Sequence, residues 1–79
     1  MLLLSLVQAQ TATSESVYDG QPVPHWQAAL TDSDPKVRRR AAYALGQIGP
    51  AAAPAISDLG TALADRHVEV AWYTADALA

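Results

Sequence analysis

The amino-acid sequence predicts an all-α fold, an α-solenoid built from antiparallel helix pairs behind a flexible N-terminal segment. Three observations lead to this fold class. Apolar residues recur at helical spacing from residue 22 onward, Gly–Pro and Asp–Pro pairs divide the chain into helix-length segments, and the whole pattern recurs after 33 residues. The chain is also rich in alanine and contains no phenylalanine, which is typical of closely packed helices.

The composition restricts the chain to one small domain and excludes several kinds of site. With 79 residues and no cysteine, it can form neither disulfides nor thiolate metal sites. His25 and His67 do not have the spacing of metal ligands. We find no nucleophile–base pair, no paired carboxylates and no phosphate-binding glycine loop, so no catalytic, cofactor or metal site is predicted. The formal net charge of −3 differs from the basic excess of nucleic-acid-binding domains.

Residues 1–10 have the character of a secretory signal that lacks its beginning. The apolar run of residues 2–7 leads into Val7-Gln8-Ala9, which is similar to a signal-peptidase site. No basic residue precedes the run, and it is far too short to span a bilayer. We therefore expect a truncated signal remnant and an exported protein, periplasmic or secreted. If the segment is instead an apolar tail, the protein is cytoplasmic.

Residues 11–21 differ from everything that follows them. They are polar and show no apolar periodicity, so they are predicted to form a linker. From residue 22 the character changes, and residues 22–79 are predicted to form the repeat domain.

The first helix pair is predicted over residues 22–49. Its first helix has apolar residues at positions i, i+3 and i+7: Val23, Trp26 and Leu30. Asp34-Pro35 predicts the start of the second helix, because Asp caps free backbone amides and Pro fits the first helical position. Gly49-Pro50 predicts its end.

The second helix of this pair is amphipathic. One face is apolar and rich in alanine, which allows a neighbouring helix to approach closely: Val37, Ala41, Ala44, Leu45 and Ile48. The opposite face is polar: Lys36, Arg39, Tyr43 and Gln47.

Residues 50–79 repeat the pattern, although this second unit is incomplete. Its apolar positions are Ile56, Leu59 and Leu63 in one helix and Val70, Thr74, Ala77 and Leu78 in the next. Leu63 follows Leu30 by 33 positions. Pro54 either lies in the first turn of the earlier helix or marks its start. A helical array needs about three repeats to bury its core, so we expect further repeats C-terminal to residue 79 in a longer parent chain.

The first helix pair also carries a motif that points to a repeat family. It reads Leu30-x-Asp32-x-Asp34-Pro35-x-Val37-Arg38-x-x-Ala41-Ala42-x-Ala44-Leu45-Gly46-x-Ile48-Gly49. This motif resembles the HEAT repeat, in particular the short bacterial HEAT-like type known from phycobilisome lyases. The leader and the segment after it are also similar to those of exported bacterial HEAT repeat proteins.

The resemblance implies which residues join the two repeats. In the family, an Asp after the first helix and an Arg early in the second commonly pair between neighbouring repeats. Asp32, Asp65 and Arg38 match these positions, whereas Ala71 replaces the second Arg. We therefore expect Arg38 to face the neighbouring repeat, within reach of Asp32 or Asp65.

The exposed face of the second helix of each pair is the predicted partner surface. These helices line the concave side of a solenoid, which is its usual binding surface, and Trp, Tyr and Arg often anchor interfaces. The surface comprises Arg39, Tyr43, Trp72, Tyr73 and Asp76. We expect Arg39 to be exposed beside Trp72. The alternative interpretation is a solvated face without a partner.

Three functions are compatible with this pattern. The first is a non-enzymatic protein–protein interaction scaffold that needs no cofactor and binds a protein partner. The second, which the resemblance implies, is a subunit of a HEAT-like chromophore (bilin) lyase. The third is nucleic-acid binding through Lys36, Arg39 and Arg40, against which the net acidity of the chain argues.

Overall fold

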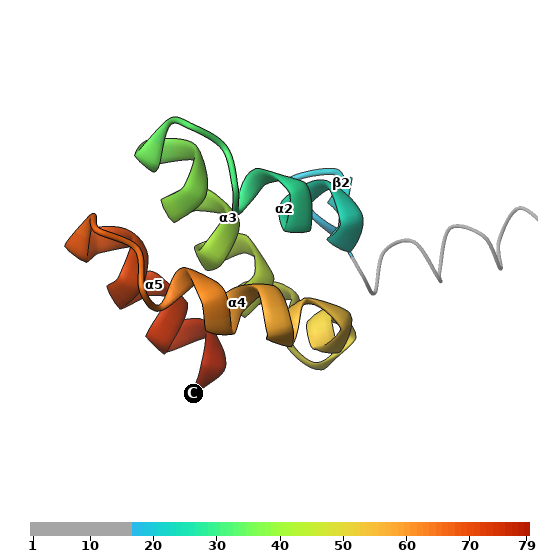
Figure 1. The fold of residues 1–79 in the computed structure, drawn as a ribbon. Helices are drawn as coiled ribbons and strands as arrows, with labels where there is room; N and C mark the ends of the chain where they lie inside the picture. The colour runs from blue at the N-terminus through green and yellow to red at the C-terminus, as the bar shows by residue number, and fades with distance from the viewer. Residues whose placement is uncertain (1–16) are drawn as a thin grey trace, which may run out of the picture.

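The computed structural model describes residues 17–79, and it contains two stacked helix pairs (Figure 1). The first pair, repeat 1, consists of α2 (Val23–Ala29) and α3 (Pro35–Ile48). The second pair, repeat 2, consists of α4 (Ile56–Ala62) and α5 (Val68–Leu78), and the 3-10 helix η1 (Gly49–Ala55) joins the two repeats. The all-α prediction of a helical repeat is therefore confirmed.

A short β-hairpin precedes the first helix pair. Strands β1 (Val17–Tyr18) and β2 (Gln21–Pro22) pair in antiparallel fashion, with Tyr18 opposite Gln21. Asp19 and Gly20 form the turn with φ of 52° and 76°, the positive values that tight hairpin turns require. Residues 17–21, the last five of the predicted polar linker, thus form most of this hairpin. The predicted signal remnant at residues 1–10 and the start of the linker lie outside the described residues.

The hairpin closes the end of repeat 1 that faces away from repeat 2, which we call the front end. The indole Nε1 of Trp26 donates to the backbone carbonyl oxygens of Tyr18, at 3.3 Å, and Gln21, at 3.2 Å. The ring of Tyr18 meets that of Trp26 edge-on at a centroid distance of 6.0 Å. Arg40 of α3 forms an ion pair with Asp19 in the turn. By the 33-residue offset, the hairpin occupies the place that η1 holds in repeat 2.

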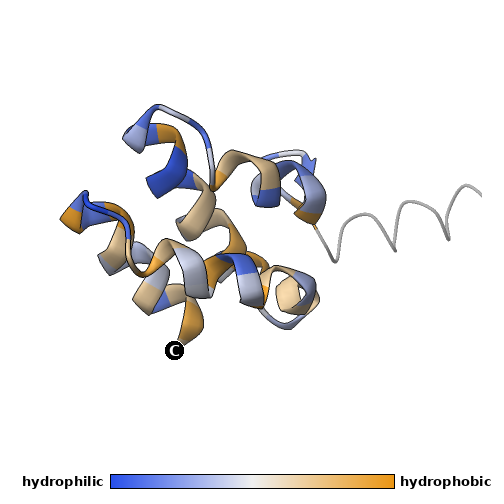
Figure 2. Cartoon of the chain, in the orientation of Figure 1, coloured by the Kyte–Doolittle hydropathy of each residue, from blue (hydrophilic) through white to orange (hydrophobic). Residues whose placement is uncertain are grey.

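Helix α3 begins and ends where the sequence predicts. The Asp34 carboxylate accepts a hydrogen bond from the backbone N–H of Lys36 at 2.9 Å, and Pro35 is the first helical residue. Gly49 ends the helix with φ of 75°, a left-handed conformation that few residues other than glycine adopt. Figure 2 shows hydrophilic residues concentrated in the first turns of α3 and apolar ones toward its end.

The core extends over α2, α3, η1 and α4, and α3 also runs side by side with α5. Small side chains allow this close approach, since Ala41, Ala42 and Ala44 are fully buried. Gly46 has the same role, because a Cβ there would lie 3.2 Å from the Cα and Cβ of Ala77. Leu45 and Val70 are among the largest fully buried side chains. The buried hydroxyl of Thr74 donates to the carbonyl oxygen of Val70 at 2.7 Å.

Helix α4 departs from the apolar stripe that the sequence predicts. Only Leu59 of the three expected residues is buried, whereas Ile56 and Leu63 are exposed. The stripe that packs on repeat 1 is formed mainly by alanines: Ala52, Ala55, Leu59 and Ala62. Pro54 lies in η1, so α4 begins two residues after it, and this geometry turns the Leu59 face toward repeat 1.

Candidate partner-binding surface

Arg38 connects the two repeats, as the family resemblance implies. Its Nε donates to Oδ2 of Asp65 at 2.6 Å, and its Nη2 donates to Oδ1 at 3.2 Å. Both side chains are largely buried, with 14% and 11% of their surface exposed, so this forked pair is shielded from water. Its Nη1 also donates to the backbone carbonyl oxygens of Asp32, at 2.7 Å, and Ser33, at 3.1 Å.

Of the two aspartates expected within reach of Arg38, Asp32 contributes its backbone carbonyl oxygen rather than its side chain. Its carboxylate does not pair with Arg38 but accepts from the backbone N–H of Asp34 at 2.9 Å, which shapes the loop before α3. The side chain of Arg38 reaches the carboxylate of the following repeat instead. Ala71 takes the position of Arg38 in repeat 2, so the equivalent connection is missing there.

The pair perturbs both ionisable groups. The hydrogen bond from Arg38 lowers the pKa of Asp65 below its ordinary value of 3.8, and the backbone N–H of His67, 2.9 Å away, lowers it further. Reciprocally, the hydrogen bond to Asp65 raises the pKa of Arg38. Each partner therefore favours the charged form of the other.

The five predicted surface residues lie on one face of α3 and α5, which we call the concave face. Arg39 is partly exposed and pairs with Glu69 at 2.8 Å, a contact that is not predicted from the sequence. Tyr43 is exposed and meets Tyr73 edge-on at a centroid distance of 6.0 Å. Trp72 is 74% exposed, and Asp76 is exposed beyond it on α5.

The aromatic residues form one continuous row across the two repeats. The row runs Trp26–Tyr18–Tyr43–Tyr73–Trp72, with centroid distances of 6.0, 5.8, 6.0 and 6.5 Å. The chain has two tryptophans, three tyrosines and no phenylalanine, so this aromatic row includes every aromatic side chain of these types. It begins under the hairpin at the front end and ends in solvent at Trp72.

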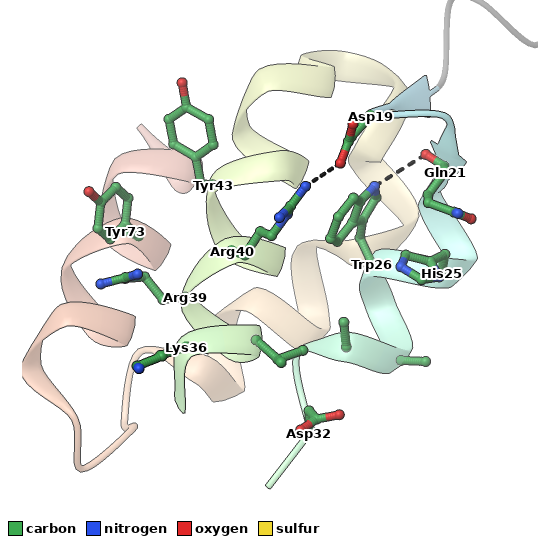
Figure 3. A pocket seen from close by; sticks show the side chains of 13 residues that line it. Asp19, Gln21, His25, Trp26, Asp32, Lys36, Arg39, Arg40, Tyr43 and Tyr73 are labelled. Atoms are coloured by element: carbon green, nitrogen blue, oxygen red, sulfur yellow. Dashed lines mark hydrogen bonds and ion pairs between the residues drawn. The ribbon is translucent and has the colours of Figure 1, made fainter. Parts of the chain in front are cut away.

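A groove of about 1040 Å³ lies beside the front half of the row (Figure 3). Trp26, Tyr43 and Tyr73 contribute aromatic surface to it, and Lys36, Arg39 and Arg40 contribute cations. Both arginines already have carboxylate partners, since Arg39 pairs with Glu69 and Arg40 with Asp19. The guanidinium of Arg40 also lies 5.9 Å from the ring centroid of Trp26. Among residues 17–79, Lys36 forms no ion pair.

Three members of this surface are not predicted from the sequence. Tyr18 falls within the predicted linker, and Trp26 is expected only in the core. The Asp-Gly pair after Tyr18 is a strong hairpin signal and could have placed it. Glu69 could have been found from the repeat offset, because it is the counterpart of Lys36 and therefore lies on the same helix face.

Other kinds of site receive no support from the part of the chain that the structure describes. Residues 17–79 contain no group of three or more His, Cys, Asp or Glu side chains that could hold a metal ion. Within the same range, none of the helices has the length and apolarity to cross a bilayer.

The comparisons with known proteins agree with the fold. The family model described as HEAT repeats matches residues 8–79, which is most of the chain. Neither the curated proteins nor the solved structures include a match to this chain.

Proposed function

This chain belongs to the HEAT repeat family, and from that premise we propose that it is a non-enzymatic scaffold for protein–protein interaction. HEAT repeats generally mediate such interactions. The proposal is that the chain acts as a stacking module, whose repeat 2 receives another helix pair, and that the assembled array presents its concave face to a partner.

The observation that carries this proposal is an apolar surface on repeat 2, which we call the back face. It consists of Ile56, Leu63, Ala75 and Leu78. Ile56 and Leu63 are 57% and 45% exposed, whereas their counterparts Val23 and Leu30 are 7% and 4% exposed.

The same contrast holds on the second helix of each pair. Leu78 is 37% exposed and its counterpart Leu45 only 1%. Ala75 is exposed, whereas its counterpart Ala42 is fully buried.

The chemistry of the occupant follows from the interface inside the molecule. The corresponding face of repeat 1 is covered by α4 and α5, which present small and apolar side chains to it. The back face therefore suits another helix pair of the same kind, such as a further HEAT repeat C-terminal to residue 79. Covering it would remove apolar surface from water, which stabilises by about 25 cal/mol for each Å² buried.

A tandem extension tests this proposal directly. A copy of residues 47–79 placed after Ala79 continues the 33-residue period, and Ala79→Gly supplies the glycine that Gly46 provides in repeat 1. We expect one cooperative thermal transition whose midpoint lies at least about 10 °C above that of the original chain. A stabilisation of 1 kcal/mol raises the thermal midpoint of a domain of this size by about 4–8 °C.

A matched control separates stacking from a general effect of chain length. Leu63→Lys with Leu78→Lys places charges on the back face of the first copy, where both side chains are exposed in the original chain. These substitutions should barely change the thermal midpoint of the original chain. In the extended chain they should lower the midpoint to the value of the original chain. Two separate transitions in the unmodified extension would overturn the proposal, since the added helix pair would then not be stacked.

Nucleic-acid binding is not favoured by the arrangement of the basic residues. Arg39 and Arg40, two of the three cations expected to carry it, are engaged by Glu69 and Asp19. Neutralised guanidinium groups release few counterions from a phosphate backbone, and counterion release supplies most of the non-specific affinity.

A further inference from the structure

We propose that the concave face binds an extended, proline-rich segment of a partner protein that carries an acidic residue at one end and a basic residue at the other. This inference rests on the proposed scaffold function and names the class of its partner. It is based on three observations: the aromatic row, the internal pairing of the central charges, and two charges of opposite sign, one at each end of the surface.

The aromatic row provides the apolar part of the surface. Tyr43, Tyr73 and Trp72 are all exposed, and the contact between Tyr43 and Tyr73 bridges the two repeats. The neighbouring rings are edge-to-face or tilted, so their faces point in different directions and offer apolar surface to a partner. Proline rings pack on such aromatic surfaces, and the solvated backbone of a polyproline II helix can accept hydrogen bonds from tyrosine hydroxyls and indole N–H groups.

The charges in the middle of the surface are internally compensated. Arg39 is 2.8 Å from Glu69, and this pair lies between α3 and α5 on the same face as the tyrosines. The centre of the surface therefore presents aromatic rings and a neutral ion pair. An uncharged segment suits this centre better than a strongly acidic or basic one.

The two ends of the surface carry charges that are available to a partner. Lys36 stands in the first turn of α3, and Asp76 stands near the end of α5. Neither forms an ion pair with another residue between 17 and 79. A partner segment that crosses the face diagonally would satisfy Lys36 with a carboxylate and Asp76 with a cation.

The length of that segment follows from the helix geometry. The contacts of Arg39 with Glu69, of Tyr43 with Tyr73 and of Gly46 with Ala77 indicate that α3 and α5 run parallel at an offset of 30 to 31 residues. Asp76 is thus level with Gly46, ten residues beyond Lys36. Ten residues of helix rise about 15 Å, and packed helices lie about 8–10 Å apart, so the diagonal is about 17–18 Å. Six steps of a polyproline II helix, at about 3.1 Å each, cover this distance.

The probe is an acetylated and amidated heptapeptide with glutamate first, arginine last, and four prolines and one leucine between them. Binding to the full chain is followed by the anisotropy of a dye on the peptide and by tryptophan emission. We expect saturable binding below about 1 mM and a blue shift of the emission, since Trp72 is exposed and Trp26 is already buried. Absence of saturable binding in this range would overturn the proposal.

Four variants locate the binding surface. Trp72→Ala and Tyr73→Ala should weaken binding at least about tenfold, as aromatic anchors of interfaces do. Lys36→Gln and Asp76→Asn should each weaken it by about two- to fivefold, the usual effect of an exposed ion pair. Lys36, Trp72 and Asp76 are exposed, so thermal melts of their variants should be unchanged, whereas Tyr73→Ala also removes the contact with Tyr43 and should lower the melting temperature slightly. Unaltered affinity in both aromatic variants would show that the peptide binds elsewhere.

A charge exchange tests the ends of the site, and a shortened peptide tests its length. Asp76→Lys should prefer a heptapeptide that ends in glutamate over the original one, reversing the wild-type order. A pentapeptide with two fewer prolines should bind several-fold more weakly, because it cannot reach both charges. An unchanged preference or an equally tight pentapeptide would contradict the diagonal placement. Stacking on the back face is measured by thermal melting, whereas peptide binding on the concave face is measured by anisotropy. A failure of one proposal can therefore be distinguished from a failure of the other.

Discussion

Repeat 1 and repeat 2 carry the same apolar pattern but have different surroundings. Repeat 1 is covered behind by η1, α4 and α5, and at its front end the hairpin packs on Trp26 and Tyr43 beside the groove. Within residues 17–79, repeat 2 is covered only on the side of repeat 1, and Ile56, Leu63 and Leu78 are exposed on the other side.

The difference shows that a helical apolar pattern specifies a face but not its burial. Leu45 and Leu78 are the same residue at equivalent positions, and each follows an Ala-x-Ala segment. Only the presence of a neighbouring helix separates the fully buried Leu45 from the exposed Leu78. Burial in a repeat protein is therefore a property of the interface between units, and nearest-neighbour contacts carry much of the stability.

The largest expected effect tests this comparison with one matched pair of substitutions. Leu45→Ala removes a fully buried side chain from the interface between α3 and α5 and should lower the free energy of unfolding by about 2–5 kcal/mol. Leu78→Ala should lower it by less than about 1 kcal/mol, because part of that side chain is already in water. Urea denaturation followed by circular dichroism measures both. An equal loss in the two variants would mean that the back face is covered in solution.

The second prediction concerns the ion pair that repeat 1 has and repeat 2 lacks. The pKa of Asp65 is lowered on folding, so the folded chain binds fewer protons there than the unfolded chain. Its contribution to stability is fully present above the ordinary value of 3.8 and is lost as the pH falls through the lower pKa of the folded state. Asp65→Asn should therefore reduce the loss of stability on acidification in this range.

Arg38→Ala provides the matched test, since the hydrogen bond from Arg38 is the largest cause of the lowered pKa. We would measure urea midpoints from neutral pH down to about pH 2. The fall of the midpoint with pH should be weakened in Arg38→Ala nearly as much as in Asp65→Asn. The backbone N–H of His67 accounts for the remainder. The double variant should show no weaker acid dependence than Asp65→Asn alone, because the carboxyl group is absent from both. An undiminished acid dependence in Arg38→Ala would show that another group is responsible.

Much of the repeat architecture could be predicted from the sequence because its signals are local. Asp34, Pro35 and Gly49 act within one turn of the chain, and the structure places the limits of α3 at these residues. The hairpin escaped prediction because two-residue strands have no periodicity, although Asp19-Gly20 marks its turn. The wrong stripe in α4 has a different origin, since the pattern cannot show which of two apolar sides meets a neighbour.

The candidate surface could be predicted only in part, for a similar reason. The repeat period placed Trp72 at the position of Arg39 and Asp76 at that of Tyr43, because residues at equivalent positions of parallel helices share a direction. The pairing of Arg39 with Glu69 depends on the offset of 30 between α3 and α5, which differs from the sequence period of 33. That offset is set by close packing at Gly46 and the neighbouring alanines, and no local signal reports it.

The smallest expected effect compares two glycines inside helices. A Cβ added at Gly60 in α4 would meet nothing within 4 Å, so Gly60→Ala should raise the free energy of unfolding by about 0.5–1 kcal/mol through helix propensity alone. Gly46→Ala gains the same propensity, but its Cβ would lie 3.2 Å from the Cα of Ala77, a backbone atom that cannot yield without moving α5. We therefore expect Gly46→Ala to lower stability, and urea midpoints of the two variants to shift in opposite directions. A gain of stability in both variants would mean that α3 and α5 are far enough apart at Gly46 to accommodate an added methyl group.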